Sequence, residues 1–136
     1  MSMKEYTLTR TGDRPLHFSG ECIAAADGKI HSGKEQNRWH ELAVYRTAAG
    51  KYVVEVAYRT QWQGEGAHYR ATVCSTIDEV ADEMRTTDAT EYLEGFPAHP
   101  DYADKQARLI ASLRTRLGTL ISEIFEQLPE AVEKID

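Results

Sequence analysis

The side chains best suited to binding a partner gather in residues 38–74 of this 136-residue chain. Alternation of residue types predicts sheet strands there, with one face carrying Trp39, Tyr45, Arg59, His68 and Arg70. Aromatic rings interleaved with arginines can stack single-stranded nucleic-acid bases and follow the phosphate backbone. Tryptophan and arginine are also enriched at protein interface hot spots. These five residues are therefore the predicted binding site, unless the arginines cover Trp39 and Tyr45 as structural cation–π pairs.

A second interpretation places the chemistry on the opposite face of the sheet. His40, Tyr58 and Tyr69 would then line a pocket between the sheet and a long helix, as in a small enzyme or a ligand carrier. The alternative for His40 is a buried histidine that is bonded to Tyr58 or to a backbone carbonyl.

The motifs of metal binding and catalysis are missing from the sequence. Its histidines lack the short spacings typical of a zinc site, and Cys22 and Cys74 form no Cys-x-x-Cys pair. No Gly-x-Ser-x-Gly elbow and no phosphate-binding loop is present. The histidines are His17, His31, His40, His68 and His99. The sequence thus predicts no metal, no cofactor and no catalytic residue, and it favours a binding protein over an enzyme.

Charge is distributed unevenly along the chain. The net charge is −6, yet residues 1–74 hold ten Lys or Arg against eight acids, and residues 75–136 hold six against fourteen. A negative total argues against non-specific nucleic-acid binding, and the positive half favours an acidic protein partner. No secretory signal and no apolar run of roughly 20 residues is present. We expect a cytoplasmic protein with no membrane contact.

The elements that position these residues begin with strands. A hairpin is expected across Tyr6–Leu8 and Leu16–Phe18, around the turn formers of residues 11–15. Next, a three-residue loop at 48–50 would join Thr47 to Lys51, with Gly50 in the left-handed conformation. The resulting register pairs His40, Leu42 and Val44 with Tyr58, Val56 and Val54, respectively. All the aliphatic residues of these two strands then lie on one face.

The register of the last strand is predicted from a turn at Gln63–Gly66. Pairing Trp62 with Ala67 sets Tyr58 beside Ala71 and Val56 beside Val73, which continues the apolar face. The same pairing sets Arg59 beside Arg70 on the other face, and Gln61 beside His68.

Helices are predicted for the rest of the chain. Thr76–Glu79 has the form of a capping box, and residues 88–91 repeat that pattern for a second short helix ending at Gly95. A long helix should run over 101–128, with leucine and isoleucine at helical spacing from Leu109 to Leu128. That apolar stripe is wider than one sheet contact requires, so we expect a homodimer.

Together these patterns predict one α+β domain over 1–136, with its sheet in 5–74 and its helical part in 75–136. The sheet should be an antiparallel meander of four or five strands, followed by two short helices and a long C-terminal helix packed on one sheet face. The function expected first is non-catalytic binding through protein–protein contact. Single-stranded nucleic-acid binding on the basic, aromatic face and a small enzyme or ligand carrier are the alternatives.

Overall fold

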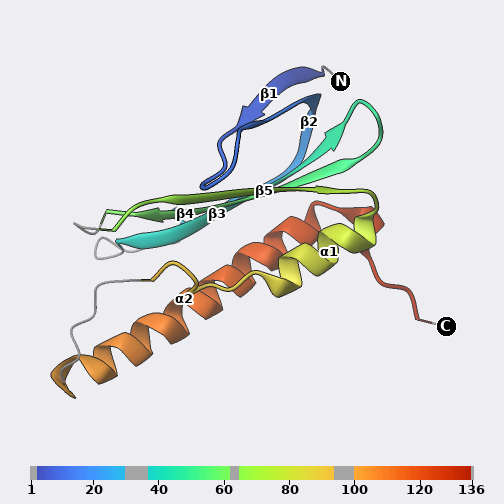
Figure 1. The fold of residues 1–136 in the computed structure, drawn as a ribbon. Helices are drawn as coiled ribbons and strands as arrows, with labels where there is room; N and C mark the ends of the chain where they lie inside the picture. Colours follow the sequence, from blue (N-terminus) through green and yellow to red (C-terminus); the bar gives the residue numbers. More distant parts are fainter. Residues whose placement is uncertain (1–2, 30–36, 62–64, 94–99, 136) are drawn as a thin grey trace.

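The computed structural model describes residues 3–29, 37–61, 65–93 and 100–135. Five antiparallel strands, joined in chain order, form one sheet: β1 (Lys4–Leu8), β2 (Leu16–Asp27), β3 (Arg38–Thr47), β4 (Tyr52–Thr60) and β5 (His68–Cys74). They are followed by helix α1 (Ile77–Thr86), helix α2 (Pro100–Glu126) and a 3₁₀ turn, η1 (Pro129–Ala131). Figure 1 shows the arrangement. The predicted α+β fold with an antiparallel meander is confirmed.

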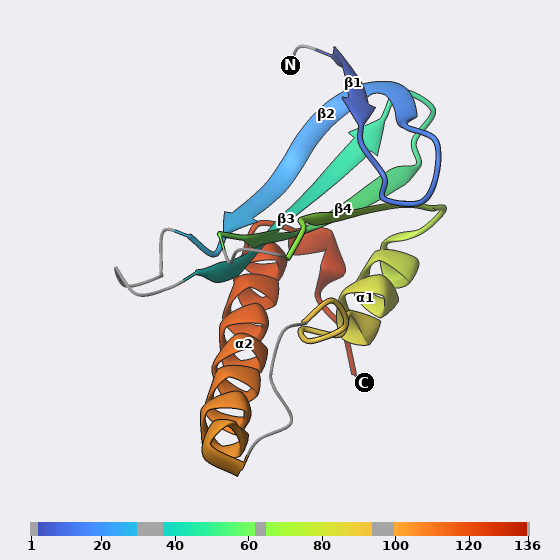
Figure 2. The ribbon, with the colours of Figure 1, turned by 60° about the vertical axis from the view of Figure 1, so that its left-hand side comes forward.

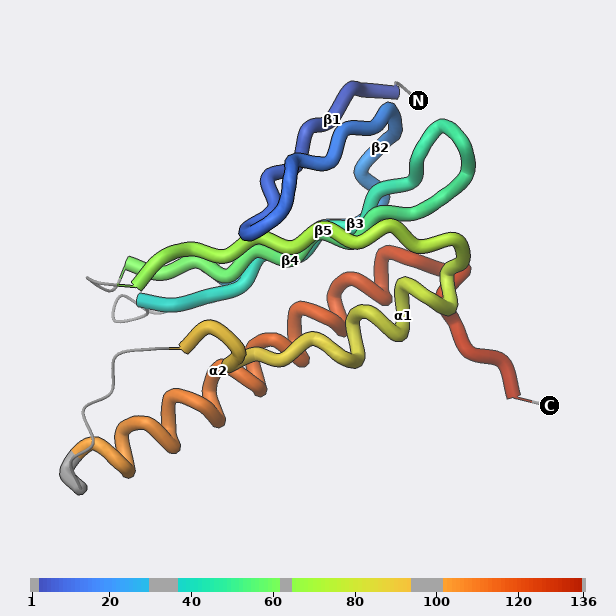
Figure 3. The backbone as a smooth tube through the Cα atoms, viewed as in Figure 1, coloured from blue at the N-terminus to red at the C-terminus, as the bar shows by residue number. Residues whose placement is uncertain are grey.

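The sheet is strongly curled along β2. Gly20 allows a close approach to β3, since a Cβ at this position would lie 2.3 Å from the Arg46 carbonyl oxygen. A β-bulge between Cys22 and Ala24 adds a local bend. The β1–β2 hairpin therefore folds over one face of the sheet, which we call the concave face. Both helices pack on the other, the convex face (Figures 1 and 3).

The hairpin loop also reaches the far edge of the sheet. The Thr11 backbone N–H donates to the Tyr69 carbonyl oxygen at 2.8 Å, and the Tyr69 N–H donates to Thr11 Oγ1 at 2.8 Å. These bonds satisfy backbone groups on the open edge of β5. The curled sheet is thereby partly closed on its concave side, as the turned view in Figure 2 shows.

Each face of the sheet has its own apolar core. The larger core fills the space between the convex face and the helices, and the smaller lies beneath the β1–β2 hairpin, where Tyr6 and Phe18 pack on Tyr45. Apolar residues buried in the larger core include Leu42, Val44, Val54, Met84, Leu113, Leu117, Leu120, Ile124 and Leu128.

The β3–β4 register is the one predicted from sequence. Val44 pairs with Val54, Leu42 with Val56, and His40 with Tyr58. The loop at 48–50 has the expected form, because Gly50 has φ +84° and the Thr47 N–H donates to the Lys51 carbonyl oxygen at 2.8 Å.

The predicted β4–β5 register is wrong. Tyr58 pairs with His68 and not with Ala71, and Val56 pairs with Arg70. A shift by an odd number of residues moves every β5 side chain to the opposite face of the sheet. Arg70 is therefore not beside Arg59. Trp62 of the proposed Trp62–Ala67 pair and residues 63–64 of the turn lie outside the described residues.

Helix α1 explains why β5 turns its polar residues inward. Arg70 Nη2 donates to Thr87 Oγ1 at 2.6 Å and lies 3.5 Å from Glu83 Oε2. Thr72 Oγ1 also bonds to Glu83, at 3.2 Å. Because α1 and the residue that follows it supply these partners, the convex face accommodates polar β5 side chains that would be costly in an apolar core.

The helical part agrees with the sequence in two elements and differs in one. Thr76 caps α1 by accepting a bond from the Glu79 N–H at 3.2 Å. The long helix predicted over 101–128 is α2, which runs from Pro100 to Glu126. The predicted second short helix does not form in the described residues, which reach residue 93 here. Instead the segment forms turns, and the Asp88 carboxylate accepts hydrogen bonds from the Thr90 N–H and hydroxyl. This side-chain bonding competes with a helical backbone. Gly95 lies outside the described residues.

Most of the α2 stripe is covered within the chain. Leu113, Leu117, Leu120 and Ile124 are buried, and Leu109 packs at the edge of the same core. The width of the stripe thus has an explanation in contacts with the sheet and α1. The homodimer remains a prediction.

Candidate pocket on the concave face

A pocket of about 460 Å³ lies on the concave face, at the end that the β1–β2 hairpin leaves uncovered. Two rows of paired residues cross the strands here. One row is Asp27, Glu41, Ala57 and Tyr69; the next is Ala25, Ala43, Glu55 and Ala71. The alanines project one carbon from the sheet, so the surface between the taller side chains is hollow. Such a volume lies within the range of small-molecule sites, roughly 300–1,000 Å³.

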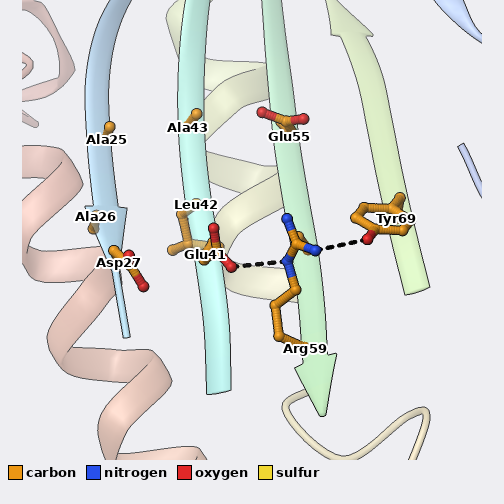
Figure 4. Close-up of a pocket in the computed structure, with 10 residues that line it drawn as sticks. Ala25, Ala26, Asp27, Glu41, Leu42, Ala43, Glu55, Arg59 and Tyr69 are labelled. Atoms are coloured by element: carbon orange, nitrogen blue, oxygen red, sulfur yellow. Dashed lines mark hydrogen bonds and ion pairs between the residues drawn. The ribbon is translucent and has the colours of Figure 1, made fainter. Parts of the chain in front are cut away.

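Arg59 is held inside this pocket from both sides. Its Nε donates to Glu41 Oε2 at 2.8 Å, and its Nη1 donates to the Tyr69 hydroxyl at 2.8 Å (Figure 4). The guanidinium carbon lies 5.1 Å from the centre of the Tyr69 ring. Trp39 Nε1 donates to the same Glu41 oxygen at 3.2 Å. Partly exposed pairs of this kind add little stability, so the consequence is mainly a fixed orientation of Arg59.

The other two carboxylates of the pocket have no cation beside them in the described part of the chain. Glu55 Oε1 accepts a bond from the Tyr45 hydroxyl at 2.8 Å, and Asp27 Oδ1 accepts one from the Lys29 N–H at 2.9 Å. Burial, together with the Glu55 carboxylate, raises the pKa of Tyr45. Tyr45 therefore stays protonated and keeps donating to Glu55.

The five residues predicted as a binding face are separated by the sheet. Trp39, Tyr45 and Arg59 lie on the concave face, whereas His68 and Arg70 lie on the convex face. The rings of Trp39 and Tyr45 are not free to stack on a partner, since each residue is 8% exposed. Two arginines were predicted on this face, and only Arg59 lies there. Its guanidinium lies over the Tyr69 ring, and not over Trp39 or Tyr45 as the structural cation–π alternative expected.

The alternative pocket of His40, Tyr58 and Tyr69 is also divided. His40 and Tyr58 pack together on the convex face, with ring centres 5.4 Å apart, and both are buried. Tyr69 lies on the concave face, one row from Glu55. His68 stacks on Tyr92 at 4.0 Å.

His40 is surrounded by positive charge on the convex face. Burial, together with the nearby charges of Arg116 of α2 and Arg70 of β5, lowers its pKa from 6.5 to about 4. Tyr58 of β4 packs on its ring. The imidazole is consequently neutral at pH 7, as expected of a core histidine.

Lowering the pH should therefore lower the free energy of unfolding, because protonation of His40 favours the unfolded chain. The unfolded chain takes up this proton near pH 6.5 and the folded chain only near pH 4, so the contribution is complete above pH 6.5 and is lost as the pH falls to about 4. We expect a loss of about 3 kcal/mol over that interval. Urea unfolding as a function of pH should show a shallower acid dependence for His40→Gln than for the parent. Parallel curves for His40→Gln and the parent would contradict this assignment.

Sequence reasoning missed the acidic and small residues of the pocket. Glu41 and Glu55 are acidic residues within β3 and β4. Ala25, Ala43 and Ala57 each lie between two buried residues of their strand, and cross-strand pairing places them close to these acids. A signal was present in this alternation of alanine and acid.

Comparison with known proteins finds no match: no family model, no curated protein and no solved structure resembles this chain. Within the described residues, no group of three or more His, Cys, Asp or Glu is placed to hold a metal ion. His31 and His99 lie outside that part. None of the described helices is both long and apolar enough to cross a membrane. The pocket geometry is therefore the basis for any functional assignment.

Proposed function

We propose that this protein is a binding module whose site is the concave pocket, and that it takes a small organic ligand. The observation that supports this most is the hollow of about 460 Å³ over an alanine floor, in which hydrogen bonds to Glu41 and Tyr69 fix the Arg59 side chain. Ligand sites combine a concave surface with a few convergent polar groups in the same way.

This proposal is favoured over the two other binding modes expected from sequence. Base stacking needs accessible rings, and Trp39 and Tyr45 are both buried. Three carboxylates in the pocket also oppose a phosphate backbone. Protein–protein contact through this face loses its aromatic anchor for the same reason. A hollow with fixed polar groups suits a small molecule better than a flat protein surface.

Filling the pocket tests the proposal. Three probes share one aromatic ring and differ in charge: benzylamine, benzyl alcohol and benzoate. We expect at least one of them to shift the amide NMR signals of Ala43, Ala57 and Tyr69 in a saturable manner at millimolar concentration. Ala25→Trp should abolish these shifts, because Ala25 is an exposed part of the pocket floor.

The matched control is Ala111→Trp, which adds the same side chain on the exposed surface of α2. It should bind the probe like the parent, and both variants should melt within a few degrees of it. If no probe shifts the pocket signals, or if Ala25→Trp leaves binding unchanged, the pocket is not a ligand site.

A further inference from the structure

We infer that the ligand of the concave pocket carries a positively charged nitrogen group, an ammonium or a guanidinium. This inference rests on the proposed function, because it assigns a chemical class to the ligand of the same pocket. It differs from the acidic partner expected from sequence, which required Arg59 and Arg70 to lie together.

The charges that line the pocket are the first argument. Asp27, Glu41 and Glu55 supply three carboxylates, and Arg59 is the one cation among the lining residues. Two of the Arg59 nitrogens already donate, to Glu41 and to the Tyr69 hydroxyl. An anionic ligand would therefore meet two uncompensated carboxylates and a guanidinium that is already engaged. A cationic ligand would meet complementary charge.

The hydrogen bonds of the three carboxylates are the second argument. Glu41 receives both of its bonds, from Arg59 and Trp39, on Oε2. Glu55 receives its bond on Oε1, and Asp27 on Oδ1. In the described part of the chain, each carboxylate thus keeps one oxygen without a protein donor. Ammonium and guanidinium groups carry several N–H donors and no acceptor, which matches a set of free acceptors.

The spacing of two carboxylates is the third argument. Glu41 pairs with Ala57 and Glu55 pairs with Ala43, so the two acids occupy diagonal positions of β3 and β4. Diagonal neighbours across a sheet lie roughly 7–8 Å apart. The Arg59 guanidinium spans from Glu41 to Tyr69 and so occupies the space above Ala57, which lies between them in the same row. A single cationic nitrogen group above Ala43 could contact both carboxylates, while the remainder of the ligand lies over the alanine floor.

The three ring probes test the charge directly. Their dissociation constants, measured by NMR titration at low salt, should rank benzylamine tightest, benzyl alcohol next and benzoate weakest. We expect benzylamine to bind about tenfold more tightly than benzyl alcohol, as for one added charge-assisted hydrogen bond. Raising the salt concentration should reduce this advantage.

Glu55→Gln keeps the shape of the pocket and removes one charge, so it should bring the affinity for benzylamine close to that for benzyl alcohol measured on the same variant. Glu91→Gln, which neutralises an exposed acid outside the pocket, should behave like the parent. Benzoate binding as tightly as benzylamine would overturn the inference and leave the ligand site in place. An unchanged benzylamine advantage in Glu55→Gln would also overturn it. Failure of all three probes would instead remove the proposed site itself.

Discussion

Val54→Asp should lower the free energy of unfolding by several kcal/mol, on the order of 3–5 kcal/mol. Val54 is 1% exposed, in the middle of β4, and faces the larger core. Its neighbours across the strands are Val44 and Thr72. Arg70, diagonal to Val54 on the same face, is already bonded to Thr87 and paired with Glu83, so the new carboxylate must either be buried unpaired or take up a proton. Urea unfolding of the purified variant measures the loss.

Val73→Asp is the matched control for this prediction. Val73 lies on β5 and is 48% exposed on the other face of the sheet. The same substitution there should change stability by about 1 kcal/mol or less. Equal effects at the two positions would mean that the faces of the central strands have been assigned wrongly.

Glu65→Ala should also destabilise the fold by about 3–5 kcal/mol. The Glu65 side chain is 2% exposed and that of Arg38 is 7% exposed. Arg38 donates to Glu65 through Nε at 3.1 Å and through Nη2 at 2.9 Å, and the Tyr58 hydroxyl donates to the same carboxylate. Removing the carboxylate leaves a buried guanidinium and a buried hydroxyl without this acceptor. Chemical denaturation gives the size of the effect.

The comparison that isolates the buried charge is a triple variant. Arg38→Met, Tyr58→Phe and Glu65→Leu together replace the network with apolar groups, and this variant should recover most of the stability that Glu65→Ala loses. Asp82→Ala, which breaks the exposed Arg85–Asp82 pair, should cost less than about 1 kcal/mol. A Glu65→Ala variant as stable as Asp82→Ala would show that Arg38 does not depend on Glu65.

Local rules of sequence accounted for the elements whose partners are close along the chain. The hairpin loop at 48–50, the capping of α1 by Thr76 and the stripe of α2 each depend on a few neighbouring residues, and each appears as predicted. Such local preferences need no knowledge of the rest of the fold. The sequence around Asp88 suits both a helix cap and a turn, and the turn is the one that forms.

The candidate site was predicted only in part, because it depends on which face each strand presents. Arg59 was named from sequence and lies in the pocket, whereas the acids and alanines around it were not named. Trp39 and Tyr45 were predicted on the correct face and Tyr69 on the wrong one. The β1–β2 hairpin was predicted, but its position over Tyr45 could not be foreseen. Whether a side chain is exposed depends on elements distant in sequence.

The sequence by itself determined the order of the five strands and of helices α1 and α2, the β3–β4 pairing and the apolar faces of β3 and β4. The tertiary structure decided the register of β5 and the curl of the sheet. In β5 the apolar residues Tyr69, Ala71 and Val73 alternate with His68, Arg70 and Thr72, so the pattern alone favours the apolar set on the helix-covered face, whereas the structure places the polar set there. Glu83 and Thr87 bond the polar set and settle the choice. That choice brings Tyr69 beside Arg59 and completes the pocket.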